Sequence, residues 1–395
     1  MKVHIKRSHY HGSIVAPPSK SFCHRYLVAG ALSGGSKISH IGDSEDISAT
    51  LDCLSAFGSI FERNKDTVTF GTVLYGNPDF PCGESGTTLR FFVPLALTKY
   101  PTARFTGSPR LLKRGISEYQ RALKTVSFDI KKDEIVTRGM LLPGHYKMAG
   151  NESSQYISGM LLAFPLLPGD STLEVVGPLG SEPYVRMTQQ AMEAFGIKVT
   201  RKGSTFVVPG NQSYRGVSAS VEGDFSNSSF LEALGFLGGE VQVNGLREFS
   251  SQGDRAYRDF FPMLHKETSA IDLTNCIDLG PILFVFACLN HGGVFVGTKR
   301  LRTKESDRGE LMAKELKKAG VTVSFGPNYI GIGRYQPNGP LAFDAHHDHR
   351  IAMALSLFST VSDVTIEGAE CVKKSFPEYW EILKKLGADL TYEGE

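Results

Sequence analysis

The sequence predicts a mixed α/β fold built from six similar units, and three observations support this prediction. An amphipathic segment, a glycine and an alternating apolar segment recur together along the chain. The recurrences are almost evenly spaced. The composition, with 41% apolar and 21% charged residues, is that of an ordinary soluble globular protein. With 395 residues, the chain has room for two or three domains.

Each recurrence predicts the end of a helix, a left-handed glycine cap and the start of a strand. The shared positions are Gly58, Ser127 (a serine in the glycine position), Gly196, Gly320 and Gly387. The intervals between them are 69, 69, 124 and 67 residues. Because 124 is nearly two periods, a further copy is expected near residue 265. We therefore predict six units, with the fifth in chain order shortened near residues 265–271.

Positive charge lies in or beside five predicted helix starts. This arrangement is unfavourable in isolation, because the exposed N–H groups of a helix start repel cations and attract anions. Its repetition predicts a small ligand that carries several phosphates or carboxylates. The five segments are residues 19–25, 83–90, 110–114, 304–308 and 348–350.

Each of these segments also has a purely structural interpretation. Lys20 and Ser21 follow two prolines and a candidate cap, Ser19, so they could hold a phosphate or face solvent beside a capped helix. The glycine-bearing turn at Gly86 could bring backbone N–H groups to an anion, although such turns are common. Residues 153–155, Ser-Ser-Gln, could bind a hydroxylated or phosphorylated ligand or simply begin a very apolar helix.

Three acidic or histidine-rich segments allow similar alternatives. Asp278 precedes the longest apolar run and could cap a helix or act as a general base, with desolvation raising its proton affinity. Glu305 lies among cations, either on a solvated face or where it exchanges a proton with a ligand. The run of residues 344–350 contains three histidines, but an anion site at His349 and Arg350 is favoured over a metal site.

The composition excludes several classes of protein. A net charge of +2 is small for a nucleic-acid-binding protein. The six cysteines have no CxxC spacing, so neither a zinc site nor a redox pair is expected, and reduced thiols fit a cytoplasmic protein. The N-terminus lacks a signal-peptide core, and the longest apolar run, residues 282–289, is too short to cross a bilayer. We expect a cytoplasmic monomer without nucleic-acid or membrane partners.

Taken together and in order, the motifs of residues 16–380 closely resemble the 5-enolpyruvylshikimate-3-phosphate (EPSP) synthase family. The similar stretches are PPSKSFCHR, GESGTTLRFF, RLLKRGI, ESSQYISG, SEPYVRM, VEGDFS, SQGD, IDLGP, RTKESDR, HDHRIAMA and CVKKSFPEYW. The resemblance implies two similar domains, each of three βαβαββ units with helices packed inside, and an active site in the cleft between them. One domain would span residues 20–222, and the other residues 1–19 and 223–395.

The resemblance also implies an activity, the transfer of the enolpyruvyl group of phosphoenolpyruvate to the 5-hydroxyl of shikimate 3-phosphate, which releases phosphate and needs no metal or organic cofactor. Asp278 would be the general base and Glu305 the proton donor, together with Lys20. The residues implied to bind shikimate 3-phosphate are Lys20, Ser21, Arg25, Ser153, Ser154, Gln155, Ser181, Asp278 and Lys304. Those implied to bind phosphoenolpyruvate are Lys20, Gly86, Arg90, Arg114, Gln155, Arg308, Arg350 and Lys374.

The sequence departs from the family pattern at three positions. Glu84 stands where many members have asparagine, Asn227 replaces a serine, and Arg300 replaces an asparagine that some members use for a phosphate, so we assign it no role. Gly86 leaves room in the phosphoenolpyruvate pocket, which predicts inhibition by glyphosate. Two alternatives are enolpyruvyl transfer to a UDP-sugar, against which Lys20-Ser21 argues, and a non-catalytic anion- or RNA-binding scaffold, which would not need Asp278 and Glu305 among its cations.

Overall fold

Two units make up the chain, and the computed structural model describes residues 1–394 of it. Unit 1 consists of Met1–Pro17 and Gly223–Glu395, and unit 2 of Pro18–Glu222. The chain therefore passes from unit 1 to unit 2 after Pro17 and returns after Glu222. Among the described residues there are five four-stranded sheets and one two-stranded sheet. Each four-stranded sheet has a parallel first pair of strands and two antiparallel strands beyond it. These two strands form a hairpin in every sheet except β20-β21-β1-β22, where they are the first and last strands of the chain.

Unit 2 contains three four-stranded sheets, each with helices between its strands. The first has the order β14-β3-β5-β4, with β14 (Ser218–Ser220), β3 (Lys37–Ser39), β5 (Thr67–Val73) and β4 (Ser59–Asn64). The second has the order β6-β7-β9-β8, with β6 (Asp79–Pro81), β7 (Thr102–Thr106), β9 (Glu134–Arg138) and β8 (Ser127–Ile130). The third has the order β10-β11-β13-β12, with β10 (His145–Ala149), β11 (Ser171–Val176), β13 (Thr205–Val208) and β12 (Thr200–Lys202).

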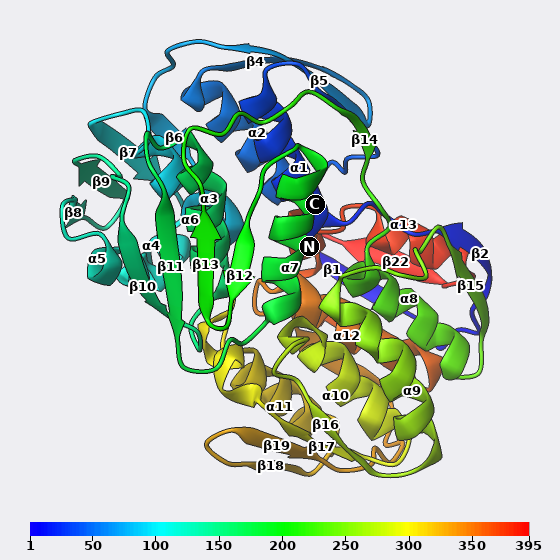
Figure 1. Ribbon diagram of the computed structural model, residues 1–395. Coiled ribbons are helices and arrows are strands. Elements are labelled where there is room, and N and C mark those ends of the chain that lie inside the picture. Colours follow the sequence, from blue (N-terminus) through cyan, green and yellow to red (C-terminus); the bar gives the residue numbers. More distant parts are fainter. Residues whose placement is uncertain (395) are drawn as a thin grey trace. The chain divides into compact units, whose positions relative to one another are not determined.

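The helices of unit 2 pack against one another on the inner faces of these sheets. Contacts between α3 and α6, α6 and α7, and α1 and α7 join the helices of all three repeats (Figure 1). Their apolar residues form one core with the sheets. The helices are α1 (Lys20–Ser33), α2 (Glu45–Phe57), α3 (Gly86–Ala96), α4 (Pro109–Arg114), α5 (Ser117–Ala122), α6 (Ser154–Ala163) with the 3-10 turn η1 (Phe164–Leu166), and α7 (Glu182–Ala194).

Unit 1 contains two four-stranded sheets and the two-stranded one. The order β16-β17-β19-β18 joins β16 (Ser269–Asp272), β17 (Gly293–Val296), β19 (Tyr329–Ile332) and β18 (Val323–Phe325). The order β20-β21-β1-β22 joins β20 (Leu341–Asp344), β21 (Val364–Glu367), β1 (Lys2–Ile5) and β22 (Leu390–Glu393). The two-stranded sheet pairs β15 (Glu240–Asn244) with β2 (His11–Val15) in parallel.

The helices of unit 1 likewise share one apolar core, in which α10 contacts α9, α11 and α12 (Figure 1). The α-helices are α8 (Phe225–Phe236), α9 (Tyr257–Lys266), α10 (Gly280–Leu289), α11 (Arg308–Lys318), α12 (His349–Ser356) and α13 (Tyr379–Lys385). The 3-10 turns are η2 (Gly253–Ala256), η3 (Ile277–Leu279), η4 (Thr298–Thr303), η5 (Leu357–Thr360) and η6 (Ala369–Lys374).

The N-terminal strands complete sheets that the rest of the chain leaves unfinished. β1 pairs with both β21 and β22 and so supplies the last strand of a C-terminal repeat. β2 supplies the first strand of the repeat that contains α8 and β15. In unit 2 the corresponding first strand, β14, comes from the end of that unit and pairs with β3. In each unit, strand pairing therefore joins segments from near the two ends of that unit's sequence.

The shortened repeat predicted near residues 265–271 is present, because α9 ends at Lys266 and β16, the first strand of the next sheet, begins at Ser269. No antiparallel strand pair separates them, whereas each of the five four-stranded sheets has one. Its place in the chain was predicted wrongly. Its helices α8 and α9 follow three complete pairs of helices, so it is the fourth repeat in chain order and not the fifth.

Four of the five predicted helix ends have a left-handed glycine. Gly58, Gly196, Gly320 and Gly387 all have positive φ, between 78° and 106°, directly after or one residue past a helix. Ser127 differs, because α5 ends at Ala122 and Ser127 already begins β8. A serine would be strained in the left-handed region. The chain therefore turns between α5 and β8 without a left-handed residue at position 127.

Candidate functional site

The start of α1 carries the first group of predicted site residues. The Lys20 ammonium donates to Asp46 Oδ2 of α2 at 2.7 Å, and both side chains are largely buried. Ser21 is the second residue of the helix. Ser19 is the N-cap residue, as the sequence predicts, but its side chain makes no capping hydrogen bond. The first turn of α1 contains no acidic residue of its own, and the positive end of a helix favours an anion.

Arg25 lies one turn further along α1 and is 2% exposed. Its guanidinium donates to Thr188 Oγ1 at 2.8 Å, to the Tyr184 carbonyl at 2.8 Å and to the Ser21 carbonyl at 2.7 Å. Burial lowers the pKa of Arg25 to about 10. This arginine therefore joins α1 to α7 and fixes the backbone at Ser21, while it remains a cation at neutral pH.

The start of α3 brings together four further predicted residues. Arg90 donates to Gln155 Oε1 at 2.5 Å and lies over the Tyr156 ring, and Gln155 Nε2 donates to Thr87 Oγ1 at 2.8 Å. A β-carbon on Gly86 would lie 3.0 Å from an Arg90 nitrogen and 3.1 Å from both terminal nitrogens of Arg114. The two guanidinium groups thus face the backbone of Gly86 so closely that a side chain at this position would press on both.

Arg114 corrects one detail of the sequence analysis. The segment Arg110–Arg114 was predicted to place its cations at a helix start, but α4 has only six residues and Arg114 is the last of them. Its charge is therefore at the end of the helix where a cation is favourable. Arg114 instead lies against the start of a different helix, α3, at Gly86.

The remaining predicted residues of unit 2 lie at two other helix starts. Ser153 is the N-cap of α6, where its hydroxyl accepts from the backbone N–H of Gln155, and Ser154 is the first residue of that helix. Ser181 precedes α7 in the left-handed conformation, with φ of 55° and ψ of 37°, and is 3% exposed. A non-glycine residue in this region is uncommon and is found more often at functional sites.

A buried chain of hydrogen bonds links the starts of α1 and α3. His24 Nδ1 bonds to Thr50 Oγ1, Thr50 to Thr88 Oγ1 and Thr88 to Ser85 Oγ, each at 2.7 Å. Ser85 is the N-cap of α3. Burial lowers the pKa of His24 to about 3, so the imidazole is neutral. The sequence analysis missed this network, because its members lie in three separate helical segments.

We expect Thr50→Val to lower the free energy of unfolding by about 1–3 kcal/mol, because the substitution keeps the side-chain shape but leaves the buried His24 and Thr88 atoms without their partner. Urea denaturation at neutral pH measures this change. The matched control is Thr172→Val, which removes a hydroxyl that bonds His145 at the surface, and which should change stability by less than about 0.5 kcal/mol. Equal losses in the two variants would contradict the structural role of the network.

In unit 1, predicted residues from η3, the segment before α11 and the start of α12 converge on one carboxylate. Asp278 Oδ1 lies 3.0 Å from Lys304 Nζ, 2.7 Å from Arg308 and 3.9 Å from Arg350 Nε. Arg350 also donates to the Asp278 carbonyl at 3.2 Å. Glu305 lies 2.6 Å from the other end of the Arg308 guanidinium.

Asp348 completes this arrangement. It is fully buried and accepts from Arg308 Nε at 2.9 Å, from Ser306 Oγ at 2.8 Å and from the backbone N–H of Arg350 at 3.0 Å. The sequence analysis did not assign it a role, although its position before a helix predicts the N-cap that it forms. We call Asp278, Lys304, Glu305, Arg308, Asp348 and Arg350 the unit 1 cluster.

The pKa values in the cluster differ from the sequence-based expectation. Burial favours the neutral acid, but the charges of Lys304, Arg350 and Arg308 outweigh it and hold the pKa of Asp278 well below its ordinary value. The sequence analysis predicted the opposite direction, because it considered desolvation alone. Burial lowers the pKa of Lys304, although Asp278 opposes that shift. Desolvation acts against Arg308 as well, yet Asp348, Glu305 and Asp278 raise the pKa of its guanidinium.

A second carboxyl that the sequence analysis missed lies near this cluster. Asp254, in η2, is buried and accepts a hydrogen bond from Ser226. Burial raises the pKa of Asp254 to about 6, and the nearby Asp278 charge adds to the shift. Its motif, SQGD, was noted in the sequence, but nothing in the spacing indicated that η2 approaches Asp278.

The other highlighted residues of unit 1 lie around these. Lys374 is the last residue of η6, a turn that packs against α12, and is 6% exposed. Asn227 is buried near it and donates to the Ser375 carbonyl at 3.4 Å, so this departure from the family pattern is accommodated inside the unit. Arg300 donates to the Thr274 carbonyl and ties η4 to the loop after β16. In unit 2, Glu84 is exposed in the loop before α3.

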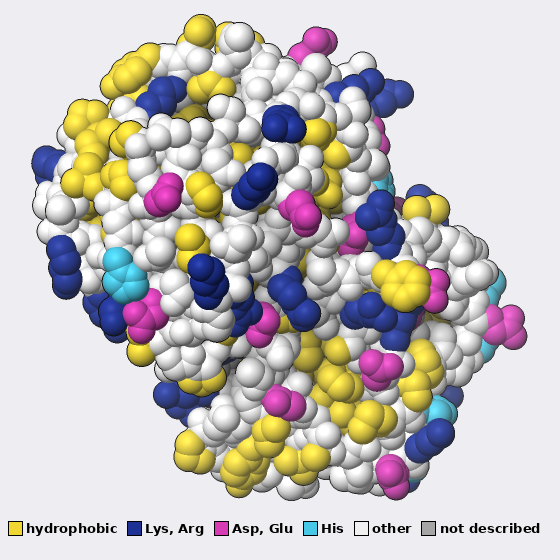
Figure 2. Space-filling view, viewed as in Figure 1, with side chains coloured by type: hydrophobic (Ala, Val, Ile, Leu, Met, Phe, Trp, Pro, Cys, Tyr) yellow, Lys and Arg dark blue, Asp and Glu magenta, His cyan; other side chains and the backbone are white. Residues whose placement is uncertain are grey.

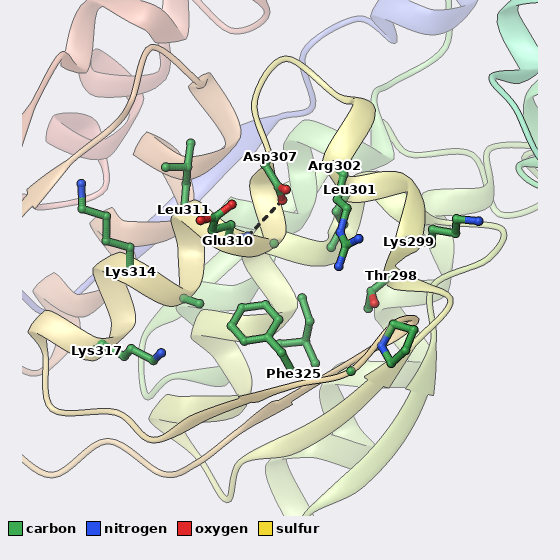
Figure 3. A pocket seen from close by; sticks show the side chains of 15 residues that line it. Thr298, Lys299, Leu301, Arg302, Asp307, Glu310, Leu311, Lys314, Lys317 and Phe325 are labelled. Atoms are coloured by element: carbon green, nitrogen blue, oxygen red, sulfur yellow. Dashed lines mark hydrogen bonds between the residues drawn. The ribbon is translucent and has the colours of Figure 1, made fainter.

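One further groove in unit 1, of about 880 Å³, lies between α11, η4 and the β18–β19 turn. Figure 3 shows Phe325 inside it, with Asp307 bonded to the start of α11 at its upper edge. Its lining mixes cations such as Lys299, Arg302 and Lys314 with Asp307 and Glu310, and it includes no member of the unit 1 cluster. The groove is therefore separate from the predicted site.

The described residues form neither a metal site nor a membrane-spanning helix. Within residues 1–394, no three His, Cys, Asp or Glu side chains are grouped in a way that could hold a metal ion. None of the described helices has the length and apolar character needed to span a membrane. On the face drawn in Figure 2, Lys and Arg side chains are interspersed with Asp and Glu instead of forming a continuous basic surface, which is not the distribution typical of nucleic-acid-binding proteins.

Comparison with known proteins gives a consistent result. The family model described as EPSP synthase (3-phosphoshikimate 1-carboxyvinyltransferase) matches residues 5–263 and 260–383. The chain is 35% identical over 419 residues to the 3-phosphoshikimate 1-carboxyvinyltransferase of Clostridium kluyveri, covering 98% of each chain. It is 34% identical over 422 residues to that of Clostridium perfringens strain 13, covering 99% of this chain and all of the relative.

Solved structures share the fold. The EPSP synthase from Acinetobacter baumannii has a TM-score of 0.79 at 23% identity, covering 99% of this chain and 100% of that one. The enolpyruvyl transferase NikO from Streptomyces tendae has a TM-score of 0.75 at 15% identity, covering 99% and 98%. At these identities the likeness concerns the arrangement of βαβαββ repeats, and it confirms the predicted fold class.

Proposed function

This chain belongs to the EPSP synthase family and transfers the enolpyruvyl group of phosphoenolpyruvate to shikimate 3-phosphate in aromatic amino acid biosynthesis, and we propose which of its residues perform each part of that reaction. The observation that carries the proposal is the unit 1 cluster, in which three cations surround the carboxylate of Asp278. Both substrates are polyanions, and such a cluster offers cations to bind them and a carboxylate to accept a proton.

Shikimate 3-phosphate binds mainly to unit 2. The helix start at Lys20 and Ser21 is suited to its phosphate, since it combines an ammonium, a hydroxyl and the positive end of a helix. Arg25 holds that backbone in place. The hydroxyls at the starts of α6 and α7 provide donors and acceptors for the sugar-like ring. The assigned residues are Lys20, Ser21, Arg25, Ser153, Ser154, Gln155 and Ser181 in unit 2, with Asp278 and Lys304 in unit 1.

Phosphoenolpyruvate binds where guanidinium groups are closest together. In unit 2, Arg90 and Arg114 both face Gly86, and a planar fork of donors is suited to carboxylate and phosphate oxygens. In unit 1, Arg308 and Arg350 face the same carboxylate, Asp278. The assigned residues are Lys20, Gly86, Arg90, Arg114 and Gln155 in unit 2, with Arg308, Arg350 and Lys374 in unit 1.

Asp278 accepts the proton of the 5-hydroxyl as its oxygen bonds to the central carbon of phosphoenolpyruvate, and Glu305, with Lys20, donates a proton to the methylene carbon. A tetrahedral intermediate results. Glu305 then takes back a proton from the methyl carbon, the double bond reforms as the carbon–oxygen bond to phosphate breaks, and the leaving phosphate accepts the proton held by Asp278. The fixed cations stabilise the charge of the intermediate without reorganising.

The low pKa of Asp278 is consistent with this role once the substrates bind. In the cluster, Lys304, Arg350 and Arg308 hold the pKa of Asp278 down against the effect of burial. Anionic substrates on the same cations would oppose their field, and the proton affinity of Asp278 would rise. Asp278 would then act as a base when the hydroxyl is in place.

A phosphate-release assay with shikimate 3-phosphate and phosphoenolpyruvate tests the activity directly. We expect one phosphate to be released for each phosphoenolpyruvate consumed, and none when either substrate is omitted. Treatment with a chelator should leave the rate of release unchanged. A second reaction with UDP-N-acetylglucosamine as the acceptor tests the alternative transferase. Phosphate release with the UDP-sugar, but not with shikimate 3-phosphate, would overturn the proposal.

Gly86→Ala should raise the KM for phosphoenolpyruvate by about tenfold, or ~1.4 kcal/mol of lost binding, because the added methyl group presses on the Arg90 and Arg114 guanidinium groups at 3.0–3.1 Å. We also expect the wild type to be inhibited by glyphosate, and the variant to be less sensitive. The control is Gly35→Ala, which would meet nothing within 4 Å and has no positive φ. Equal KM values in all three proteins would remove Gly86 from the site.

The enzyme is expected to act as a cytoplasmic monomer. No disulfide forms among the described residues, and five of the six cysteines are buried thiols, which fits a reducing compartment. Light scattering of the purified protein determines its oligomeric state.

A further inference from the structure

Two consecutive residues before α12 have a strained backbone. His346 and His347 have φ values of 52° and 57°, in the left-handed region. A single non-glycine residue in this region is uncommon, and such residues persist only where the surroundings hold them. The turn that they form leads directly into Asp348 and Arg350. Whatever holds the turn therefore influences the position of two members of the unit 1 cluster.

Glu315 of α11 is the group that holds it. This side chain is completely buried, and its two oxygens accept from three donors: His346 Nε2 at 2.8 Å, the backbone N–H of Asp344 at 3.1 Å and Lys318 Nζ at 2.6 Å. Because a carboxylate only accepts here, the His346 ring carries its proton on Nε2. Asp344 in turn accepts from the backbone N–H of His346 at 2.7 Å. The carboxylate of Glu315 thus holds both the backbone of Asp344 and the side chain of His346.

The same helix also holds the end of the turn. Arg308 and Glu315 are seven residues apart on α11, which places them on one face of the helix, two turns apart. Arg308 bonds Asp348, and Glu315 bonds His346 and Asp344. α11 therefore holds the segment 344–348 at two places: Glu315 bonds Asp344 and the strained His346, and Arg308 bonds Asp348, so that only the strained His347 lies between them.

We propose that Glu315 and His346 are positioning residues for the reaction: together they clamp the left-handed turn onto α11 and so orient Asp348, Arg308 and Arg350 toward phosphoenolpyruvate. The proposal rests on the assignment of Arg308 and Arg350 to that substrate. Neither Glu315 nor His346 touches the substrate in this view, and neither was assigned a role from the sequence.

His346→Gly is the main test, because glycine adopts the left-handed conformation readily while the contact to Glu315 is lost. We expect the KM for phosphoenolpyruvate to rise by about tenfold, with the KM for shikimate 3-phosphate within about twofold of the wild type. His346→Gln should restore most of the loss, since its amide can donate to Glu315 from nearly the same place. Glu315→Gln, a second route to the same defect, should raise the same KM selectively.

Two controls separate positioning from general damage. His347→Gly relieves the same backbone strain without touching the clamp, and Lys318→Met removes an exposed partner of Glu315 that lies on α11 itself. Both should leave the two KM values unchanged. The melting temperature of every variant is measured alongside. If His346→Gly does not fold, Glu315→Gln takes its place in the comparison, and the reverse exchange is made if Glu315→Gln does not fold.

Arg350→Met distinguishes a failure of the proposed clamp from a failure of the assignment of Arg350 to phosphoenolpyruvate. If Arg350→Met raises the KM for phosphoenolpyruvate but neither His346→Gly nor Glu315→Gln does so, the clamp is wrong and the residue assignment stands. If Arg350→Met has no effect on that KM, the residue assignment itself fails. Equal rises in both KM values for the clamp variants would mean that they damage the fold generally, which also overturns the proposal.

Discussion

Replacing Asp278 by asparagine is expected to lower kcat by about 10²–10⁴-fold, the range that a positioned general base contributes. The amide keeps the shape of the side chain but cannot accept the hydroxyl proton. Initial rates at saturating concentrations of both substrates measure the effect. A kcat within threefold of the wild type would remove Asp278 from the mechanism.

The KM values make this prediction more specific. Asp278 currently neutralises part of the charge of Lys304, Arg308 and Arg350. Its conversion to a neutral amide would leave these cations more attractive to an anion, so we expect the KM for phosphoenolpyruvate to stay the same or fall. A carboxylate whose only function was to hold the arginines in place would instead raise that KM when it is lost.

Two further variants show whether the effect on kcat is specific to the assigned catalytic carboxylates. Glu305→Gln should also lower kcat more than it affects binding, because it removes the assigned proton donor beside Arg308. Glu310→Gln removes an exposed carboxylate from the first turn of α11, outside the cluster. It should therefore leave kcat unchanged, and it shows whether loss of negative charge near α11 is sufficient to affect turnover.

The sequence predicted those features that depend on neighbouring residues. The helix ends at Gly58, Gly196, Gly320 and Gly387 could be identified because a left-handed glycine after an amphipathic segment is a local signal. The missing hairpin after α9 could be inferred from the repeat interval alone. These features fixed the number of repeats and one irregularity among them.

The features that the sequence did not predict depend on pairs of residues distant along the chain. Lys20 and Asp46 are 26 residues apart, Arg90 and Gln155 are 65 apart, and Arg308 and Asp348 are 40 apart. A helix start can be recognised from its own residues, but which other helix packs against it depends on the tertiary arrangement. The pKa of Asp278 shows the consequence, since its direction is decided by cations that come from two other segments.

Asp348→Asn is expected to produce the largest loss of stability, about 3 kcal/mol in the free energy of unfolding, because it breaks a buried ion pair. The loss lies at the lower end of the range for such pairs, since Arg308 keeps Asp278 and Glu305 as partners. Arg308 is 1% exposed, and both of its bonds to Asp348 are buried. Urea denaturation at pH 7 measures the change. The control is Asp389→Asn, which breaks a 2.7 Å pair with Lys6 at the surface and should cost no more than about 1 kcal/mol.

The pH dependence gives an independent check on the same residue. Burial would raise the pKa of Asp348, but the charge of Arg308 outweighs it and lowers the pKa to about 2. Because the pKa of the folded state lies below the ordinary value of 3.8, Asp348 stabilises the fold fully above about pH 4, and this contribution is lost as the pH falls towards 2. The stability of the wild type should therefore fall more steeply below pH 4 than that of Asp348→Asn. Parallel curves would mean that Asp348 does not anchor Arg308, and the same result would weaken the case that Arg308 is held in place for a substrate.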